Sequence, residues 1–288
     1  MAELPILFIL DIDKTLIGDG SFISKLNTFA LFINKSCKRN KINNSNNICK
    51  INSNFWKNNI SSNFFRPFIK ELINGIRKTY PNSEFFVYST GISEYVNTIV
   101  NLLEKYIGEF KFNKPYFSRE KAFIDSKNFY EKDINFYTKS IIKTLKNKYP
   151  SISDKIDEIL SERTIIIDDL NVWNNDYRHI QIKPYDFNPI YEFDYNLLKM
   201  IYENDYIYEY CTTKGLLSIE RGNNLNNFLF NYHIEMINKY KQNEKYNNYN
   251  LNDNEFEKLL KIITNLNKKT GNLFTKANLN MIKKKMET

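Results

Sequence analysis

Three short apolar runs along the chain have the pattern of strands that are buried on both faces. They span residues 4–10 (LPILFIL), 84–88 (EFFVY) and 164–167 (TIII). None of them alternates between apolar and polar positions, as a half-exposed strand would. The pattern therefore predicts three strands of a parallel sheet.

Amphipathic helical patterns separate these runs. Apolar residues recur three and four positions apart over residues 68–78 and 93–106, and further helical patterns cover 139–149 and 153–160. Strands that alternate with helices imply right-handed crossovers between parallel strands. We therefore expect an α/β fold, a Rossmann-like parallel sheet with helices on both faces.

Two regions interrupt this alternation. Residues 18–62 are rich in Asn and Lys, which is typical of an insertion or loop with little structure of its own. This insertion either lies over the end of the first strand or is a solvated loop without a role. Residues 110–138 are aromatic and irregular in pattern, which indicates small strands and loops.

The chain changes character near residue 200. Beyond it Asn, Lys, Tyr and Glu dominate, and helical patterns recur over 224–240 and 254–267 without residues that suggest chemistry. We therefore expect a main domain over residues 1–195 and a small helical extension, or partner-binding tail, over 196–288.

The net charge of the chain limits the possible classes of binding partner only slightly. The 288 residues include 41 Lys and Arg against 33 Asp and Glu, a net charge of +8. This excess suits an acidic or phosphorylated partner, or loose contact with nucleic acid, but not a dedicated nucleic-acid binder. The abundance of Asn, Lys, Ile, Tyr and Phe, which AT-rich coding favours, explains the excess equally well.

The cysteine content and the hydropathy of the chain indicate the cellular compartment to expect. Cys37, Cys49 and Cys211 are odd in number and widely spaced, so neither a disulfide framework nor a zinc site is expected. No stretch approaches the about 20 apolar residues of a membrane span. We therefore expect an intracellular protein of the cytoplasm or nucleus, without membrane contact. The AT-rich composition hints at a viral or protist-like genome, and in the viral case at a protein that acts inside a host cell.

Carboxylate pairs follow two of the three predicted strands. Asp11 and Asp13 come directly after the first run, and Asp168 and Asp169 after the third. The carboxyl ends of parallel strands share one edge of the sheet, where open α/β folds bind ligands. Carboxylates this close repel unless a cation separates them or one holds a proton. One pair alone could be a turn, but both together indicate a metal site, an acid–base pair, or both.

The second run ends in Ser89-Thr90-Gly91. A hydroxyl and a glycine after a buried strand suit phosphate, through a side-chain donor and nearby backbone N–H groups. The alternative is that Ser89, Thr90 or Ser93 only caps the helix that follows.

Several motifs, taken in order, resemble one family of phosphatases. Asp11-Ile12-Asp13-Lys14-Thr15 is similar to the DxDxT signature of haloacid-dehalogenase (HAD)-type phosphatases. The further motifs are Arg66-Pro67, Tyr88-Ser89-Thr90-Gly91 followed by Glu94-Tyr95, Arg119-Glu120, Lys132-Asp133, and Asp168-Asp169 through Val172-Trp173 to Lys183-Pro184-Tyr185. Over residues 5–190 their order resembles the FCP/SCP group. This group comprises phosphatases of the RNA polymerase II C-terminal domain and is also called NLI-interacting-factor-like.

The resemblance implies a HAD-like fold and a role for each matched residue. Asp11 would be the nucleophile that forms an aspartyl-phosphate, and Asp13 would be the general acid and base. Thr15 would steady the motif, and Ser89 would contact the phosphate. Lys132 would neutralise the phosphate and the nucleophile.

The resemblance also implies a magnesium ion. Asp11, Asp169 and the backbone carbonyl of Asp13 would ligate Mg²⁺, which prefers oxygen ligands. Asp168 would support the lysine or a metal-bound water.

Two assignments stay open within this resemblance. Lys121 and Lys127 are alternatives to Lys132 as the catalytic lysine. Substrate choice in the family depends on a pocket beside the site, and aromatic residues of the irregular region either form it or only fill the core of a small sheet. These residues are Phe117, Phe123, Phe129 and Tyr130.

The resemblance implies a phosphoric monoester hydrolase, a Mg²⁺-dependent phosphatase that acts on phosphoserine or phosphothreonine in a peptide or protein. One alternative is a nucleic-acid or small-molecule phosphatase, since a fold does not determine its substrate. Another is a catalytically silent binding module, against which the complete set of catalytic residue types argues. The oligomeric state is left open.

Overall fold

The computed structural model describes residues 4–20, 60, 62–119, 123–124, 130–132, 134–173, 176–187, 252–266 and 273–287. The chain divides into two compact units. One contains Met1–Gly18, Phe65–Asp186 and Asp253–Thr288, and the other contains Asp19–Phe64 and Phe187–Asn252. The second unit includes the 3-10 helix η2 (Ser62–Phe64). All that follows concerns the first unit.

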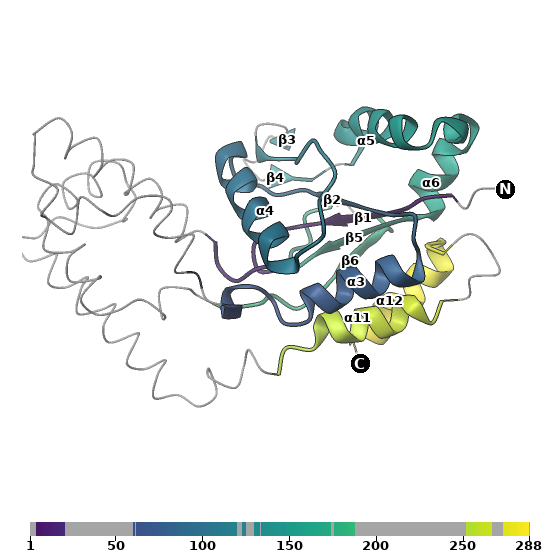
Figure 1. The fold of residues 1–288 in the computed structure, drawn as a ribbon. Coiled ribbons are helices and arrows are strands. Elements are labelled where there is room, and N and C mark those ends of the chain that lie inside the picture. The colour runs from purple at the N-terminus through teal and green to yellow at the C-terminus, as the bar shows by residue number, and fades with distance from the viewer. Residues whose placement is uncertain are drawn as a thin grey trace, which may run out of the picture. The chain divides into compact units, whose positions relative to one another are not determined.

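A four-stranded parallel sheet forms the centre of this unit (Figure 1). Its order is β2-β1-β5-β6, with β1 at Ile6–Leu10, β2 at Ser83–Val87, β5 at Thr164–Asp168 and β6 at His179–Gln181. The three predicted apolar runs are β1, β2 and β5, and their parallel pairing is confirmed. The sequence did not indicate β6, because it is only three residues long and ends in the exposed Gln181.

Helices cover the sheet on two sides, as the pattern predicted. They are α3 (Ile69–Thr79), α4 (Ser93–Ile107), α5 (Asn135–Lys148), η4 (Pro150–Lys155), α6 (Ile156–Glu162), α11 (Glu255–Thr264) and α12 (Lys276–Glu287). In Figure 1, α5 and α6 lie on one side of the sheet, and α3, α11 and α12 lie on the other. None of the helices in the described part of the chain is both long and apolar enough to cross a membrane.

The alternation of side chains along β1 explains how both faces are buried. All five residues of β1 are buried. Leu7 and Ile9 join a core cluster with residues of α5 and α6. Phe8 points to the other face, where its ring centroid lies 4.9 Å from that of Phe85 and 5.7 Å from that of Phe274. Because successive side chains of a strand point to opposite faces, one apolar run supplies two core layers.

The C-terminal helices differ from the expected division of the chain. We expected residues 196–288 to form an extension beside the main domain, but α11 and α12 belong to the same unit as the sheet. Helix α11 packs on α3 so closely that a Cβ at Gly75 would lie 2.7 Å from Leu260 Cδ1. Tyr80 Oη donates to the carbonyl of Ile263 at 2.9 Å. The amphipathic face of α11 is therefore buried against this unit. The predicted helix over 224–240 lies outside the described residues.

The irregular region contains short strands, as predicted. Strands β3 (Phe123–Ile124) and β4 (Tyr130–Glu131) form an antiparallel pair. Asn113 and Phe117 donate their backbone N–H groups to Phe85 and Val87, so this segment runs beside β2. Phe117 is buried in the core, with its ring centroid 4.1 Å from that of Tyr137. Helix α5 begins four residues earlier than the helical pattern indicated.

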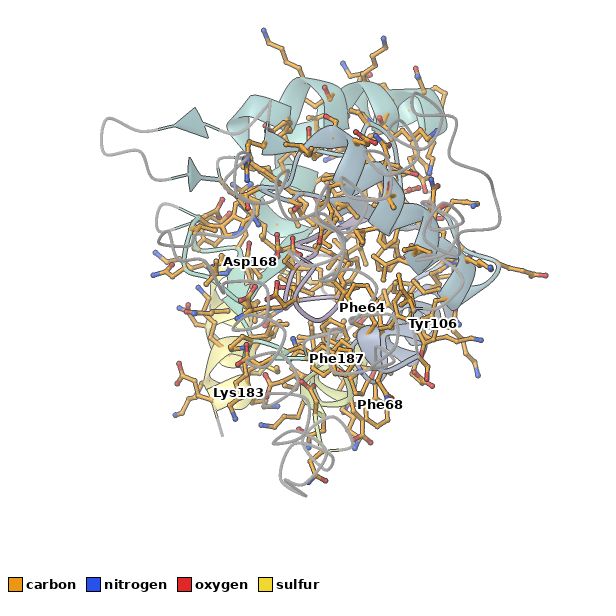
Figure 2. The ribbon with its side chains drawn as sticks, turned by 90° about the vertical axis from the view of Figure 1, so that its left-hand side faces the viewer. Phe64, Phe68, Tyr106, Asp168, Lys183 and Phe187 are labelled. Atoms are coloured by element: carbon orange, nitrogen blue, oxygen red, sulfur yellow. The ribbon has the colours of Figure 1, made fainter. Side chains whose placement is uncertain are left out.

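The order of the strands makes the carboxyl edge of the sheet a topological switch point. The chain passes from β1 to β2 on one side and from β5 to β6 on the other. The connections after β1 and β5 therefore leave in opposite directions, and ligands of open α/β folds bind at such switch points. Figure 2 looks onto this carboxyl edge, where Asp168 ends β5.

Candidate active site

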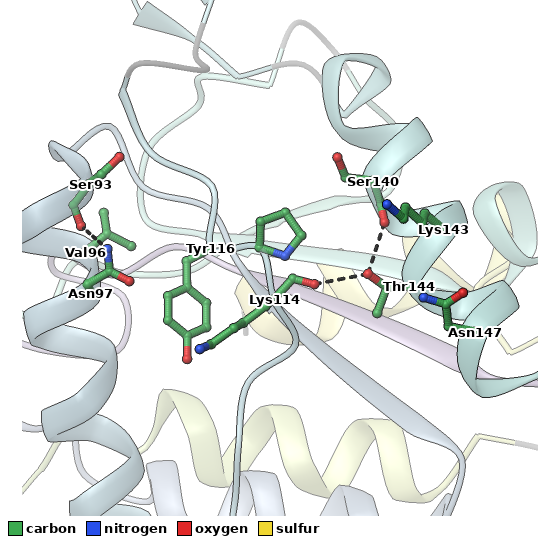
Figure 3. A pocket seen from close by; sticks show the side chains of 10 residues that line it. Ser93, Val96, Asn97, Lys114, Tyr116, Ser140, Lys143, Thr144 and Asn147 are labelled. Carbon is green, nitrogen blue, oxygen red and sulfur yellow. Dashed lines mark hydrogen bonds between the residues drawn. The ribbon is translucent and has the colours of Figure 1, made fainter.

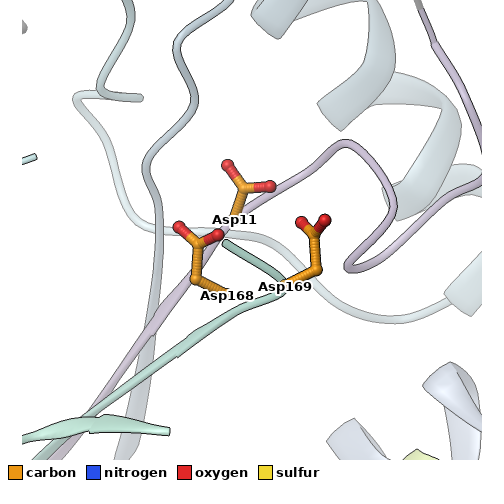
Figure 4. A group of neighbouring side chains, drawn as sticks. All are labelled: Asp11, Asp168 and Asp169. Carbon is orange, nitrogen blue, oxygen red and sulfur yellow. The ribbon is translucent and has the colours of Figure 1, made fainter. Parts of the chain in front are cut away.

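The two predicted carboxylate pairs meet at this edge. Asp11 follows β1, Asp168 is the last residue of β5, and Asp169 comes next. The backbone N–H of Asp11 donates to the carbonyl of Ile167 at 3.0 Å, which continues the β1–β5 pairing up to the site. One carboxylate oxygen from each of Asp11, Asp168 and Asp169 lies within 4.8 Å of the others (Figure 4). All three residues are buried.

Lys132 joins two of these carboxylates. Its Nζ lies 2.5 Å from Asp11 Oδ1 and 2.6 Å from Asp168 Oδ2. The side chain is only 2% exposed, although it comes from the irregular region before α5. Its backbone N–H donates to the carbonyl of Val172 at 2.8 Å, which fixes the segment next to the loop after β5. The alternatives Lys121 and Lys127 lie outside the described residues.

Burial and charge shift the proton equilibria of this group. Burial raises the pKa of Asp11, the charges of Asp168 and Asp13 raise it further, and Lys132 offsets only part of the rise. Burial alone would lower the pKa of Lys132, but the charges of Asp11 and Asp168 outweigh it and the pKa is raised. The lysine therefore stays cationic at neutral pH.

The carboxylates outnumber the cation, so the site suits a metal ion. Burial also raises the pKa of Asp169, with the charge of Asp168 adding to the rise. Three buried carboxylates against one ammonium leave negative charge that a divalent cation would neutralise. The donors are all oxygen atoms, which fits Mg²⁺ rather than a metal that prefers nitrogen or sulfur.

Asp168 holds the lysine by a set of further bonds. Its Oδ2 accepts a hydrogen bond from Trp173 Nε1 at 2.8 Å, in addition to the one from Lys132. Its Oδ1 accepts from the backbone N–H of Leu170 at 2.9 Å. Both oxygens of Asp168 thus accept from protein donors. This fits the implied role of Asp168 as support for the lysine, and leaves Asp11 and Asp169 as the side chains assigned to the metal.

Thr15 and Asp169 bind each other twice. Thr15 Oγ1 donates to Asp169 Oδ1 at 3.1 Å and accepts from the backbone N–H of Asp169 at 3.0 Å. The carbonyl of Asp169 also accepts from Gln181 Nε2 at 3.0 Å. Thr15 is fully buried. It therefore ties the turn after β1 to the residue after β5, in keeping with its implied steadying role.

Asp13 stands apart from the three clustered side chains. It is half-buried, and its Oδ1 accepts a hydrogen bond from the hydroxyl of Tyr95 in α4. A Cβ at Gly91 would clash with the Tyr95 ring, so the glycine lets this tyrosine lie against the loop after β2. Tyr95 was part of the matched motif but received no role from the sequence, because its contact joins residues far apart in the chain.

Ser89 lies at the end of β2, beside the same edge. Its backbone N–H donates to the carbonyl of Phe117 at 3.0 Å, and its Oγ accepts from the N–H of Gly91 at 3.0 Å. Helix α4 begins at Ser93 after Ile92, without a hydrogen bond from a capping side chain. The alternative that Ser89, Thr90 or Ser93 caps this helix is therefore wrong.

Aromatic rings enclose the lysine, which the sequence did not indicate. Lys132 Nζ lies 5.4 Å from the ring centroid of Tyr88 and 5.6 Å from that of Trp173. These two rings meet edge to face at 5.0 Å. Such faces favour a cation and keep water away from it. His179 is also buried near Trp173, and burial lowers its pKa, so it is neutral.

Figure 3 shows a hollow that is separate from these carboxylates. It has a volume of about 620 Å³ and lies between α4, α5 and the segment around Lys114. The hydroxyl of Thr144 donates to the carbonyl of Lys114 at 3.0 Å and so joins two of its walls. None of the clustered carboxylates lines this hollow, so we place the chemistry at the edge of the sheet.

The parallel sheet and the paired carboxylates at its switch point form the arrangement that the sequence resemblance to HAD-type phosphatases implied. More particularly, the chain belongs to the NLI interacting factor-like phosphatase family, whose family model matches residues 6–209. The resemblance seen in the sequence is thereby confirmed. Residues after 209, including α11 and α12, lie beyond the match.

Two solved structures are similar to this chain at a distance. One is Fcp1, an essential RNA polymerase II CTD phosphatase, at 17% identity over 64% of this chain and 43% of that chain, with a TM-score of 0.32. The chain thus spans less than half of that structure. The other is a phosphoserine phosphohydrolase-like protein from Francisella tularensis subsp. tularensis SCHU S4. It is 18% identical over 58% of this chain and 79% of that chain, with a TM-score of 0.27. No curated protein matches this chain.

Proposed function

We propose that the protein is a Mg²⁺-dependent phosphatase that removes phosphate from phosphoserine or phosphothreonine in a peptide or protein, through an aspartyl-phosphate on Asp11. The observation that carries this proposal is the contact of Lys132 with Asp11 inside a buried group of carboxylates. A carboxylate attacks an anionic phosphate poorly unless fixed positive charge offsets the repulsion. Lys132 supplies such a charge at the nucleophile itself.

The reaction has two steps, formation of the aspartyl-phosphate on Asp11 and its hydrolysis. Asp11 Oδ1 accepts from Lys132, so we assign the attack on phosphorus to Oδ2. The bond from phosphorus to Oδ2 forms, the bond to the serine or threonine oxygen breaks, and Asp13 gives its proton to that oxygen. Asp13 then takes a proton from water as the water attacks phosphorus. The bond from Asp11 to phosphorus breaks and inorganic phosphate leaves.

Magnesium would be held by Asp11, Asp169 and the backbone carbonyl of Asp13. When bound, it supplies positive charge to the phosphoryl oxygens. Thr15 orients Asp169 for this task through the paired hydrogen bonds. Ser89 would donate to a phosphate oxygen, since it is buried at the end of the neighbouring strand.

The test is phosphate release from three substrates, with and without Mg²⁺. A small aryl phosphate reports the chemistry, and a phosphoserine peptide and a 5′-phosphorylated oligonucleotide report the substrate class. Asp11→Asn should abolish turnover, whereas the exposed Asp154→Asn should not change it. We expect Mg²⁺-dependent turnover of the aryl phosphate and the peptide.

Other outcomes would change the proposal in defined ways. Turnover of the oligonucleotide in preference to the peptide would replace the protein substrate by nucleic acid. Binding of the phosphopeptide without turnover of any substrate would make the protein a silent binding module. Turnover that survives in Asp11→Asn would remove the aspartyl-phosphate.

A further inference from the structure

A completely buried arginine lies behind the catalytic turn. Arg66 forms a fork with Asp253, in which Nε lies 3.1 Å from Oδ1 and Nη2 lies 2.9 Å from Oδ2. The side chains of Arg66 and Asp253 are 0% and 6% exposed. The guanidinium carbon lies 5.1 Å from the ring centroid of Phe256 in α11. A buried charge needs such a partner, because water cannot solvate it.

The other side of the same guanidinium binds the turn that carries the catalytic aspartates. Arg66 Nη1 donates to the carbonyls of Lys14 and Thr15, at 3.2 and 3.3 Å. Nη2 donates to the carbonyl of Lys183 at 2.7 Å. Lys14 and Thr15 directly follow Asp13. The arginine therefore connects Asp253 to the backbone of the motif from Asp11 to Thr15.

This turn contains a residue that needs outside support. Lys14 has φ 56°, a left-handed conformation that is unfavourable for a residue with a side chain. Its carbonyl accepts from both Arg66 Nη1 and the backbone N–H of Tyr185, the latter at 2.7 Å. Such conformations persist where the surroundings determine them. The arginine and the backbone N–H of Tyr185 thus both bind the carbonyl of Lys14, in addition to the ion pair of the Lys14 side chain with Asp186.

Asp253 lies outside the family match, which ends at residue 209. It comes two residues before the start of α11 at Glu255, and the backbone N–H of Glu255 donates to its Oδ1 at 3.3 Å. The helices beyond the family region therefore deliver the acid that holds the arginine. The ion pair of Asp253 with Arg66 therefore connects α11 to the catalytic unit, in addition to the packing of its apolar face.

We propose that Asp253 is a positioning residue of the active site. Through Arg66 it fixes the turn that places Asp13 and Thr15, without touching substrate or reacting atoms. This inference rests on the proposed phosphatase function for its kinetic readout only. The position of the turn can be measured independently.

Three variants of the full chain test it. Asp253→Asn removes the charge of the acid and keeps its shape. Arg66→Met with Asp253→Leu removes both charges, which often leaves the stability of a buried pair unchanged. Glu257→Gln is the control, because its exposed ion pair with Lys261 lies on the same helix without reaching the turn.

The readouts are thermal unfolding, turnover of a small aryl phosphate, and hydrogen exchange of the turn. The amides of Thr15, Leu16 and Ile17 all donate to the carbonyl of Ile12, so exchange over residues 11–17 reports the turn directly. In the folded double variant we expect faster exchange of this segment, with α3 and α11 still protected. We expect kcat to fall about tenfold to a hundredfold with little change in KM, since small misplacements of catalytic groups have such effects.

Opposite results would overturn the inference. One is a folded double variant that keeps the wild-type kcat and the protection of residues 11–17. That result, together with an unfolded Asp253→Asn, would show that the acid serves stability alone. If the wild-type protein turns over no phosphoester, the proposed function fails, and the exchange of residues 11–17 alone decides the role of Asp253.

Discussion

Lys132 and Asp168 form a buried ion pair, with Nζ 2.6 Å from Oδ2, that places the lysine against the predicted nucleophile Asp11. Asp168 is itself held by Trp173 Nε1 and by the backbone N–H of Leu170. The position of the lysine therefore depends on the loop after β5 as much as on its own segment. A change in that loop should therefore alter the rate of the chemical step, because it displaces Asp168 and with it Lys132.

Replacement of Lys132 by Met should reduce kcat by about a hundredfold to a thousandfold, since it removes a fixed charge from the developing transition state. The measurement is steady-state turnover of an aryl phosphate at saturating Mg²⁺. Lys139→Met, an exposed position on α5, is the matched control and should keep wild-type kcat. A Lys132→Met variant with kcat near that of the wild type would transfer the role to Lys121 or Lys127.

Replacement of Trp173 by Phe should lower both stability and kcat. It removes the hydrogen bond from Nε1 to the charged Asp168, which is worth about 1.5–3 kcal/mol. The measurements are the free energy of unfolding in urea and kcat.

Tyr177→Phe is the control for Trp173, because it removes a partly buried hydrogen bond to the carbonyl of Ser161, at 2.6 Å, away from the carboxylates. It should lower stability without lowering kcat. If both variants lose stability and neither loses kcat, the hydrogen bond from Trp173 to Asp168 does not determine the catalytic position of Lys132.

The sequence predicted the sheet and its carboxylate edge well, for a physical reason. Strands β1, β2 and β5 are buried on both faces, so each contains an uninterrupted apolar run that is plain in the sequence. Asp11 follows one such strand and Asp168 ends another, and a parallel sheet brings these ends together. The local patterns therefore predict the site, because adjacent parallel strands place the residues that follow them side by side.

The contacts that no pattern indicated join segments far apart in the chain. Asp253 meets Arg66 across 187 positions, and the helix that follows it, α11, lies within a stretch whose composition suggested a separate extension. Tyr95 meets Asp13 across 82 positions. Periodicity reports which face of a helix is buried, but not which partner covers it. The sequence therefore predicted α11 as a helix but assigned it to a separate extension, whereas it belongs to the unit that contains the sheet.

Replacement of Thr15 by Val should weaken Mg²⁺ binding about tenfold to a hundredfold, because residues that orient metal ligands have effects of this size. Valine has the shape of threonine but lacks the hydroxyl that bonds Asp169 twice. The measurement is the Mg²⁺ dependence of turnover, supported by calorimetric titration of Mg²⁺. Thr15→Ser keeps the hydroxyl and should retain most of the affinity. Equal affinities of the Val and Ser variants would exclude this role of Thr15.

Replacement of Asp11 by Asn should stabilise the metal-free protein at neutral pH. Burial, followed by the charges of Asp168 and Asp13, raises the pKa of Asp11 above its ordinary 3.8, despite Lys132. A carboxyl whose pKa is higher in the folded state contributes stability that is full at pH values below its ordinary pKa. That contribution is lost as the pH rises through the raised pKa. The ionised Asp11 therefore opposes folding at neutral pH, and the neutral Asn does not.

The measurement is thermal unfolding in EDTA at a series of pH values from 4 to 8. The advantage of Asp11→Asn should be largest at the neutral end and shrink as the pH falls, because wild-type Asp11 then takes up a proton. Saturating Mg²⁺ should reverse the order at neutral pH, since an ion that binds only the folded wild-type site adds to its stability. If Asp11→Asn is the less stable protein at neutral pH in EDTA, the attraction of Lys132 exceeds the cost of burying Asp11, and the carboxylates hold the fold together without a metal.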